Sequence, residues 1–116
     1  MSNAVEDKSF KFAVRVVKLS KWLQSNQNEF ILSKQFLRSG TSIGANVAEA
    51  QQAQSRADFV SKMNIALKEC VETDYWLRLM HAADYLSEIE FQSISSDCIE
   101  IKKILISILR TSKNCL

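Results

Sequence analysis

The sequence of 116 residues contains no proline, two glycines, one histidine and three cysteines. Without proline, no residue forces a helix to break, and with two glycines the chain has no GxGxxG or GxxxxGKS/T loop to hold a phosphate. No apolar run approaches the roughly 20 residues that cross a bilayer. The N-terminal residues 1–7 are polar and lack the apolar segment of a secretory signal. These absences predict a cytoplasmic protein with no membrane partner.

The cysteines also exclude two classes of site. Cys70, Cys98 and Cys115 are odd in number and form no CxxC pair, so neither a disulfide framework nor a zinc site is predicted. This pattern of cysteine use is typical of a reducing compartment.

The single histidine gives little support to catalysis. His81 has Asp84 three residues later and Cys70 and Asp74 upstream on the same predicted helix, but no second histidine completes a set of metal ligands. We therefore predict no metal, no cofactor and no catalytic residue. An enzyme acting through His81 and nearby carboxylates is less favoured than either of the two binding functions described below.

Composition predicts one folded domain over residues 1–116, because 47% of the residues are hydrophobic and 24% are charged. The net charge of +2 is unevenly distributed. Between Lys8 and Arg38 there are seven basic residues and one acidic residue, a net charge of +6, and the rest of the chain is net acidic.

Four segments have a helical period and none alternates as a strand: approximately residues 8–24, 30–52, 55–84 and 88–113. In the third segment, apolar positions repeat at alternating steps of four and three, which is typical of left-handed, coiled-coil-like packing. Short polar turns join the segments. The sequence therefore predicts an all-α, antiparallel up-down-up-down four-helix bundle, left-handed.

In the first segment the apolar residues occupy one broad arc, which is wider than a single bundle core requires, so the first helix is expected to contribute to an oligomer interface. The arc comprises Phe10, Phe12, Ala13, Val16, Val17, Leu19 and Leu23.

Gly40 and Gly44 lie four residues apart inside a segment that favours helix. A glycine in a helix interior costs about 1 kcal/mol relative to alanine. The two share one face, which lets another backbone approach closely. Among these small residues, we expect Arg38, Asn46 and Glu49 to form a hydrogen-bonded cluster that fixes the helix register.

Two surfaces are candidates for binding. On the third helix Ile65, Trp76 and Leu79 lie off the core-facing positions, which favours a homo-oligomer; the alternative is that Trp76 packs into a corner of its own bundle.

On the first helix, a basic stripe falls within one arc of the helical wheel. It consists of Lys8, Lys11, Arg15, Lys18 and Trp22. Such a stripe can contact phosphates and stack on a base, although most charged stripes are solvated faces.

The residues from Arg38 to Ala50 resemble the central segment of the small bacterial four-helix bundle proteins related to those encoded by intervening sequences in 23S ribosomal RNA genes. The segments Ile65–Cys70 and Tyr75–Leu77 match the family as well. One departure is Ala50, where many relatives have glycine.

The resemblance implies an antiparallel four-helix bundle that commonly assembles as a homopentamer, with no established enzymatic activity. A related branch, the accessory protein of diversity-generating retroelements, binds nucleic acid and a reverse transcriptase through its basic surface. The favoured hypothesis is therefore a non-enzymatic, oligomeric accessory module that contacts RNA, DNA or a nucleoprotein partner through the first helix. The alternative is a protein–protein scaffold that binds no nucleic acid.

Overall fold

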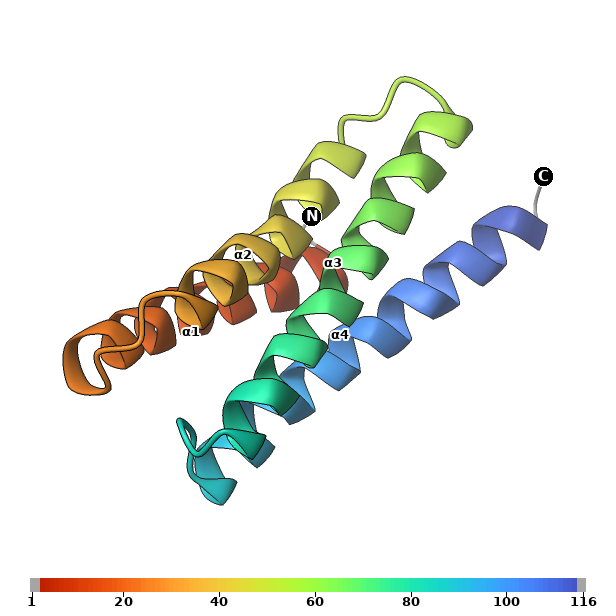
Figure 1. Cartoon of the computed structure of the whole chain (residues 1–116). Helices are drawn as coiled ribbons and strands as arrows, with labels where there is room; N and C mark the ends of the chain where they lie inside the picture. The colour runs from red at the N-terminus through yellow and green to blue at the C-terminus, as the bar shows by residue number, and fades with distance from the viewer. Residues whose placement is uncertain (1–2, 115–116) are drawn as a thin grey trace.

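Four helices, joined by short loops, account for most of the chain (Figure 1). The computed structural model describes residues 3–114, and their side chains through Ser112. The helices are α1 (Ala4–Asn26), α2 (Leu32–Ala50), α3 (Arg56–Ala82) and α4 (Glu88–Asn114). No strand occurs within the described range, so the predicted all-α four-helix fold is confirmed.

The helices pack antiparallel in chain order, α1 on α2, α2 on α3 and α3 on α4, and α4 returns beside α1. The molecule measures 47 × 24 × 20 Å along its principal axes. Figure 1 shows the α1–α2 hairpin crossing the α3–α4 hairpin, with the α1–α2 and α3–α4 loops at the same end. The contact between α1 and α4 is much smaller than the other three.

Side-chain caps set the starts of the first two helices. α1 begins at Ala4, earlier than the predicted residue 8, because the Asn3 side chain accepts a hydrogen bond of 2.8 Å from the Glu6 N–H. α2 begins at Leu32, two residues later than predicted. The buried Glu29 carboxylate accepts hydrogen bonds from the N–H groups of the first turn, those of Ile31, Leu32 and Ser33.

Serine caps start the other two helices. The Ser55 hydroxyl accepts from the Asp58 N–H at 3.0 Å, and the Ser87 hydroxyl accepts from the Glu90 N–H at 3.1 Å. α2 and α3 each end two residues before the predicted boundary, at Ala50 and Ala82.

The core runs along the centre of the bundle and takes side chains from all four helices. Its largest fully buried members are Phe12, Phe36, Leu23, Ile43, Met63, Leu77, Met80, Ile101 and Leu105. The apolar arc of α1 is covered only in part within the bundle: Phe10 is 70% exposed and Val17 is also exposed. Since only α2 and α4 flank α1, the helix buries a narrower face than its apolar residues could cover.

The two glycines lie where α2 meets α1. A Cβ atom at Gly44 would lie 3.2 Å from the Ser9 carbonyl oxygen, and one at Gly40 would lie 2.7 and 2.8 Å from the two methyl carbons of Val16. Neither glycine has a positive φ. Their role in this position is therefore close approach of two helices and not backbone freedom.

Candidate interaction surfaces of the bundle

The basic stripe of α1 divides into a paired part and a free part. Arg15 Nη1 donates to Asp97 Oδ2 of α4 at 2.6 Å, and the same guanidinium donates to Ser93. Lys8 Nζ lies 2.9 Å from Glu100 Oε1, also on α4. These two cations therefore close the small α1–α4 contact and are already compensated by carboxylates.

Lys11 and Lys18 face solvent, and neither forms an ion pair with any described residue. Trp22, the aromatic member of the stripe, is half-buried and packs against the core. It lines an open groove of about 430 Å³ between α1 and α4, together with Ile89, which is 84% exposed. The Trp22 ring is therefore not fully exposed for stacking on a base.

The outer face of α1 carries the part of the apolar arc that the bundle does not cover. Phe10, Val14 and Val17 are all exposed and follow one another at steps of four and three, so they form a single stripe. Lys11, Lys18 and Lys21 border this stripe and are also exposed.

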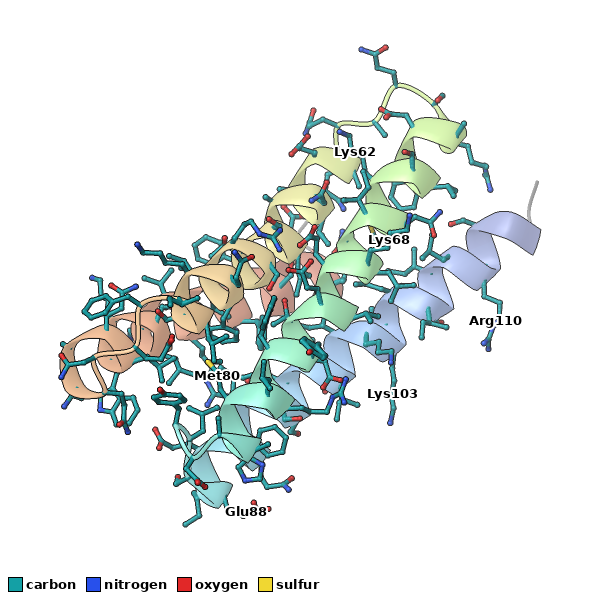
Figure 2. The ribbon with its side chains drawn as sticks, viewed as in Figure 1. Lys62, Lys68, Met80, Glu88, Lys103 and Arg110 are labelled. Carbon is teal, nitrogen blue, oxygen red and sulfur yellow. The ribbon has the colours of Figure 1, made fainter. Side chains whose placement is uncertain are left out.

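The polar residues of α2 are brought together only in part. Arg38 forms ion pairs with Glu69 and Glu72 of α3, and Glu72 also accepts a 2.9 Å hydrogen bond from Trp76 Nε1. Glu49 lies 3.2 Å from Lys62 of α3, which Figure 2 places beside the end of α2. Arg38 and Glu49 thus connect α2 to α3 at two heights.

Asn46 instead donates a hydrogen bond of 2.8 Å to the Ser42 carbonyl of its own helix. The buried hydroxyls of Thr73 and Ser39 add a 3.0 Å hydrogen bond between α3 and α2.

The outer face of α3 carries exposed apolar side chains. Ile65 is exposed, whereas Trp76 and Leu79 are half-buried and Trp76 packs against the core. Val71 and Tyr75, which sequence reasoning missed, are more exposed than Ile65. Their signal in the sequence was their position on the helical wheel opposite the heptad of core residues.

His81 belongs to the end of α3 and holds the start of α4. Its Nε2 lies 2.7 Å from Glu88 Oε2, and its ring stacks on Phe91 with a centroid distance of 4.2 Å. A hydrogen bond from Gln92 lowers the pKa of Glu88, and the neighbouring His81 adds to the effect. No group of three metal-ligating side chains occurs within the described part of the chain.

A second groove of about 510 Å³ runs between α3 and α4. Its lining is largely apolar and includes Phe91, Ile99 and Ile106, with Cys98 and Lys102 beside them. Lys68 on α3 and Lys103 and Arg110 on α4 point away from the bundle (Figure 2). Among the described helices, none is long and apolar enough to cross a bilayer.

Comparison with known proteins gives a family and a solved fold. Residues 1–107 match the family model of the 23S rRNA-intervening sequence proteins. A crystal structure from Bacteroides thetaiotaomicron, a protein of unknown function from the S23 ribosomal protein family, shares 58% sequence identity with this chain. The match covers 91% of this chain and 98% of that chain, with a TM-score of 0.91. No curated protein sequence matches this chain.

Proposed function

This chain belongs to the 23S rRNA-intervening sequence protein family, of which a solved relative has unknown function, and we propose that it acts as a non-enzymatic accessory module that assembles as a homo-oligomer. The observation that carries the proposal is the outer apolar stripe of α1, formed by Phe10, Val14 and Val17. Contiguous apolar side chains on the surface of a small protein are typical of interaction sites.

A second copy of this chain is the partner that we propose for the stripe. The exposed side chains of α3, Ile65, Val71 and Tyr75, offer a second apolar surface of the same kind. A contact between two different surfaces of one chain generates a ring when its rotation closes. This arrangement is compatible with the pentamer that the family resemblance implies.

Sedimentation velocity at micromolar concentration tests the assembly. We expect wild type to sediment as an oligomer, and the double variant Phe10→Ser/Val14→Ser to sediment as a smaller species with unchanged helix content. Ile89→Ser is the matched control, because Ile89 is the most exposed large apolar side chain but lies outside the stripe. A wild-type monomer would overturn the proposal, whereas a dimer or tetramer would remove only the pentamer.

We propose contact with nucleic acid as a second function, on the strength of a separate observation. Lys11 and Lys18 are exposed and free of ion pairs within the described residues, and no acidic residue occurs from Lys8 to Asn28. The charged residues of α1 from Lys8 onward are therefore all basic. In an oligomer, one such face per subunit gains affinity because linked weak sites bind together.

The salt dependence of binding tests this function. Each neutralised phosphate adds about −0.9 to the slope of log K against log salt on duplex DNA. We expect Lys11→Gln/Lys18→Gln to flatten the slope, while Lys68→Gln/Lys103→Gln, which removes equal charge from α3 and α4, leaves it closer to wild type. If the wild type binds neither DNA nor RNA at low salt, the nucleic-acid function is wrong, and the protein–protein scaffold is the function that remains.

A further inference from the structure

Cys70 of α3 and Cys98 of α4 face each other inside the bundle. Their sulfur atoms lie 3.8 Å apart, and both side chains are buried. Each sulfur also lies close to the backbone of the other residue, Cys70 Sγ at 3.4 Å from the Cys98 carbonyl oxygen and Cys98 Sγ at 3.6 Å from the Cys70 carbonyl oxygen. The two side chains therefore meet where α3 and α4 approach closely.

A disulfide needs a sulfur–sulfur distance of about 2.05 Å, so closure requires the two sulfurs to approach by roughly 1.8 Å. Each sulfur already lies within 3.6 Å of the carbonyl oxygen of the other cysteine, so the closure is a local movement of the two side chains and the helix segments that carry them. We propose that Cys70 and Cys98 form a redox-active dithiol, which a hydroperoxide oxidises to an intramolecular disulfide between α3 and α4.

The groove between α3 and α4 approaches the cysteine pair from the side of Cys98. Cys98 is part of its lining, next to Ser95 and Lys102, and the space of about 510 Å³ greatly exceeds the size of a hydroperoxide group. Cys98 thus lies between the groove and the Cys70 thiol.

The two thiols hydrogen-bond to each other, and either sulfur can be the donor. A hydrogen bond donated by Cys98 lowers the pKa of Cys70, the Lys102 ammonium group acts in the same direction, and burial and Asp74 oppose them. Because the thiolate is the nucleophile, the thiol that gives up its proton attacks the oxidant, and the other thiol closes the disulfide.

The reaction then balances in two steps. The thiolate of one cysteine attacks one oxygen of the hydroperoxide, the O–O bond breaks, and the sulfur becomes a sulfenic acid while the leaving oxygen takes a proton. The sulfur of the other cysteine attacks the sulfenic sulfur, and the departing hydroxide takes the proton of that second thiol and leaves as water. With hydrogen peroxide, two thiols and one peroxide give one disulfide and two waters.

Peptide mapping tests the proposal on the whole folded protein. We would treat wild type with hydrogen peroxide, remove the peroxide with catalase, block the remaining thiols in denaturant and digest with trypsin without reductant. Cleavage after Lys68, Arg78 and Lys102 places Cys70 in peptide 69–78 and Cys98 in peptide 79–102. We expect these two peptides to be joined, lighter than their sum by two hydrogen atoms, and to separate on reduction.

Two variants serve as controls. Cys115, which lies outside the described residues, falls in the separate peptide 114–116, and Cys115→Ser should form the 69–78/79–102 link as wild type does. Cys70→Ser should abolish the link. Circular dichroism during oxidation shows whether the protein stays helical.

Three results would overturn the proposal. The first is that both thiols remain free to be blocked after prolonged oxidation. The second is that each sulfur gains oxygen without a link. The third is that the link forms only after the protein has been unfolded.

Discussion

Asp84 lies two residues after the last residue of α3 and has a backbone φ of 69°. This is the left-handed region, which most side chains disfavour. Around it the Asp84 N–H donates to the His81 carbonyl and the Tyr85 N–H donates to the Met80 carbonyl, the hydrogen-bond pair of a Schellman ending. Glycine is the usual residue at this position. We expect Asp84→Gly to raise the free energy of unfolding by about 0.5–1 kcal/mol, since relief of strain exceeds the added freedom of the unfolded chain.

Urea unfolding measures this difference, and Asn28 supplies the comparison. Asn28 also has a positive φ, 53°, but asparagine tolerates the left-handed region better than most residues. Asn28→Gly should therefore change stability less than Asp84→Gly. A lowered midpoint for Asp84→Gly would show that the side chain stabilises the turn.

At the scale of the element, α2 depends on its small residues at the contact with α1. A side chain at position 44 would meet the Ser9 backbone, which cannot rotate away as a side chain can. We expect Gly44→Leu to lower the free energy of unfolding by about 1–3 kcal/mol or more through overpacking. Ala45→Leu is the control, because Ala45 is the next residue of the same helix and is exposed.

Thermal unfolding of the two variants separates overpacking from helix propensity. Leucine and alanine are both good helix formers, so Ala45→Leu should melt close to wild type. Equal melting temperatures for wild type and Gly44→Leu would contradict the close contact.

The helices were predictable from the sequence to within a few residues, because hydrophobic periodicity records which face each helix buries. Their ends were less predictable where a single side chain sets them. Glu29 was counted as one acidic charge in a basic segment, yet its carboxylate is buried and caps α2. Periodicity does not show that this charge turns inward, since its orientation is set by the conformation of the loop, in which the preceding Asn28 has a positive φ.

Surface residues were harder to assign than core residues. Periodicity placed Phe10 and Val17 in the same broad apolar arc as the core residues of α1, but it does not show where the buried face ends, because the number of neighbouring helices limits its width. The basic stripe was visible in the sequence, whereas its pairing with Asp97 and Glu100 depends on how α4 is placed beside α1. Contacts between elements distant in sequence set these assignments.

At the scale of the whole molecule, the bundle is closed by the small α1–α4 contact, in which Arg15 bonds to Asp97. Both side chains are partly exposed. A double-mutant cycle with Arg15→Gln and Asp97→Asn should give a coupling of about 0.2–1 kcal/mol, the range of exposed ion pairs. Salt screens exposed charges, and the Debye length shortens about fourfold when sodium chloride is raised from 0.05 to 1 M. The coupling energy should therefore be smaller at 1 M than at 0.05 M.

Unfolding at both salt concentrations measures the cycle. The pair Lys62 and Glu49, which joins α2 to α3, provides an ion pair of the same kind at a larger helix contact. A coupling for Arg15 and Asp97 that does not change with salt would mean that the pair is shielded from solvent.

The unequal helix contacts also determine what the two tryptophans can report. Trp22 lies in the groove between α1 and α4, and Trp76 bonds to Glu72, which pairs with Arg38 across the α2–α3 contact. If the molecule opens by separating α1 from α4 while α2 stays packed on α3, the solvent exposure of the Trp22 ring increases and that of the Trp76 ring does not. The fluorescence of each indole therefore reports on one side of the bundle. If one tryptophan is replaced by phenylalanine, the emission of the remaining tryptophan reports on the opening of its own side alone.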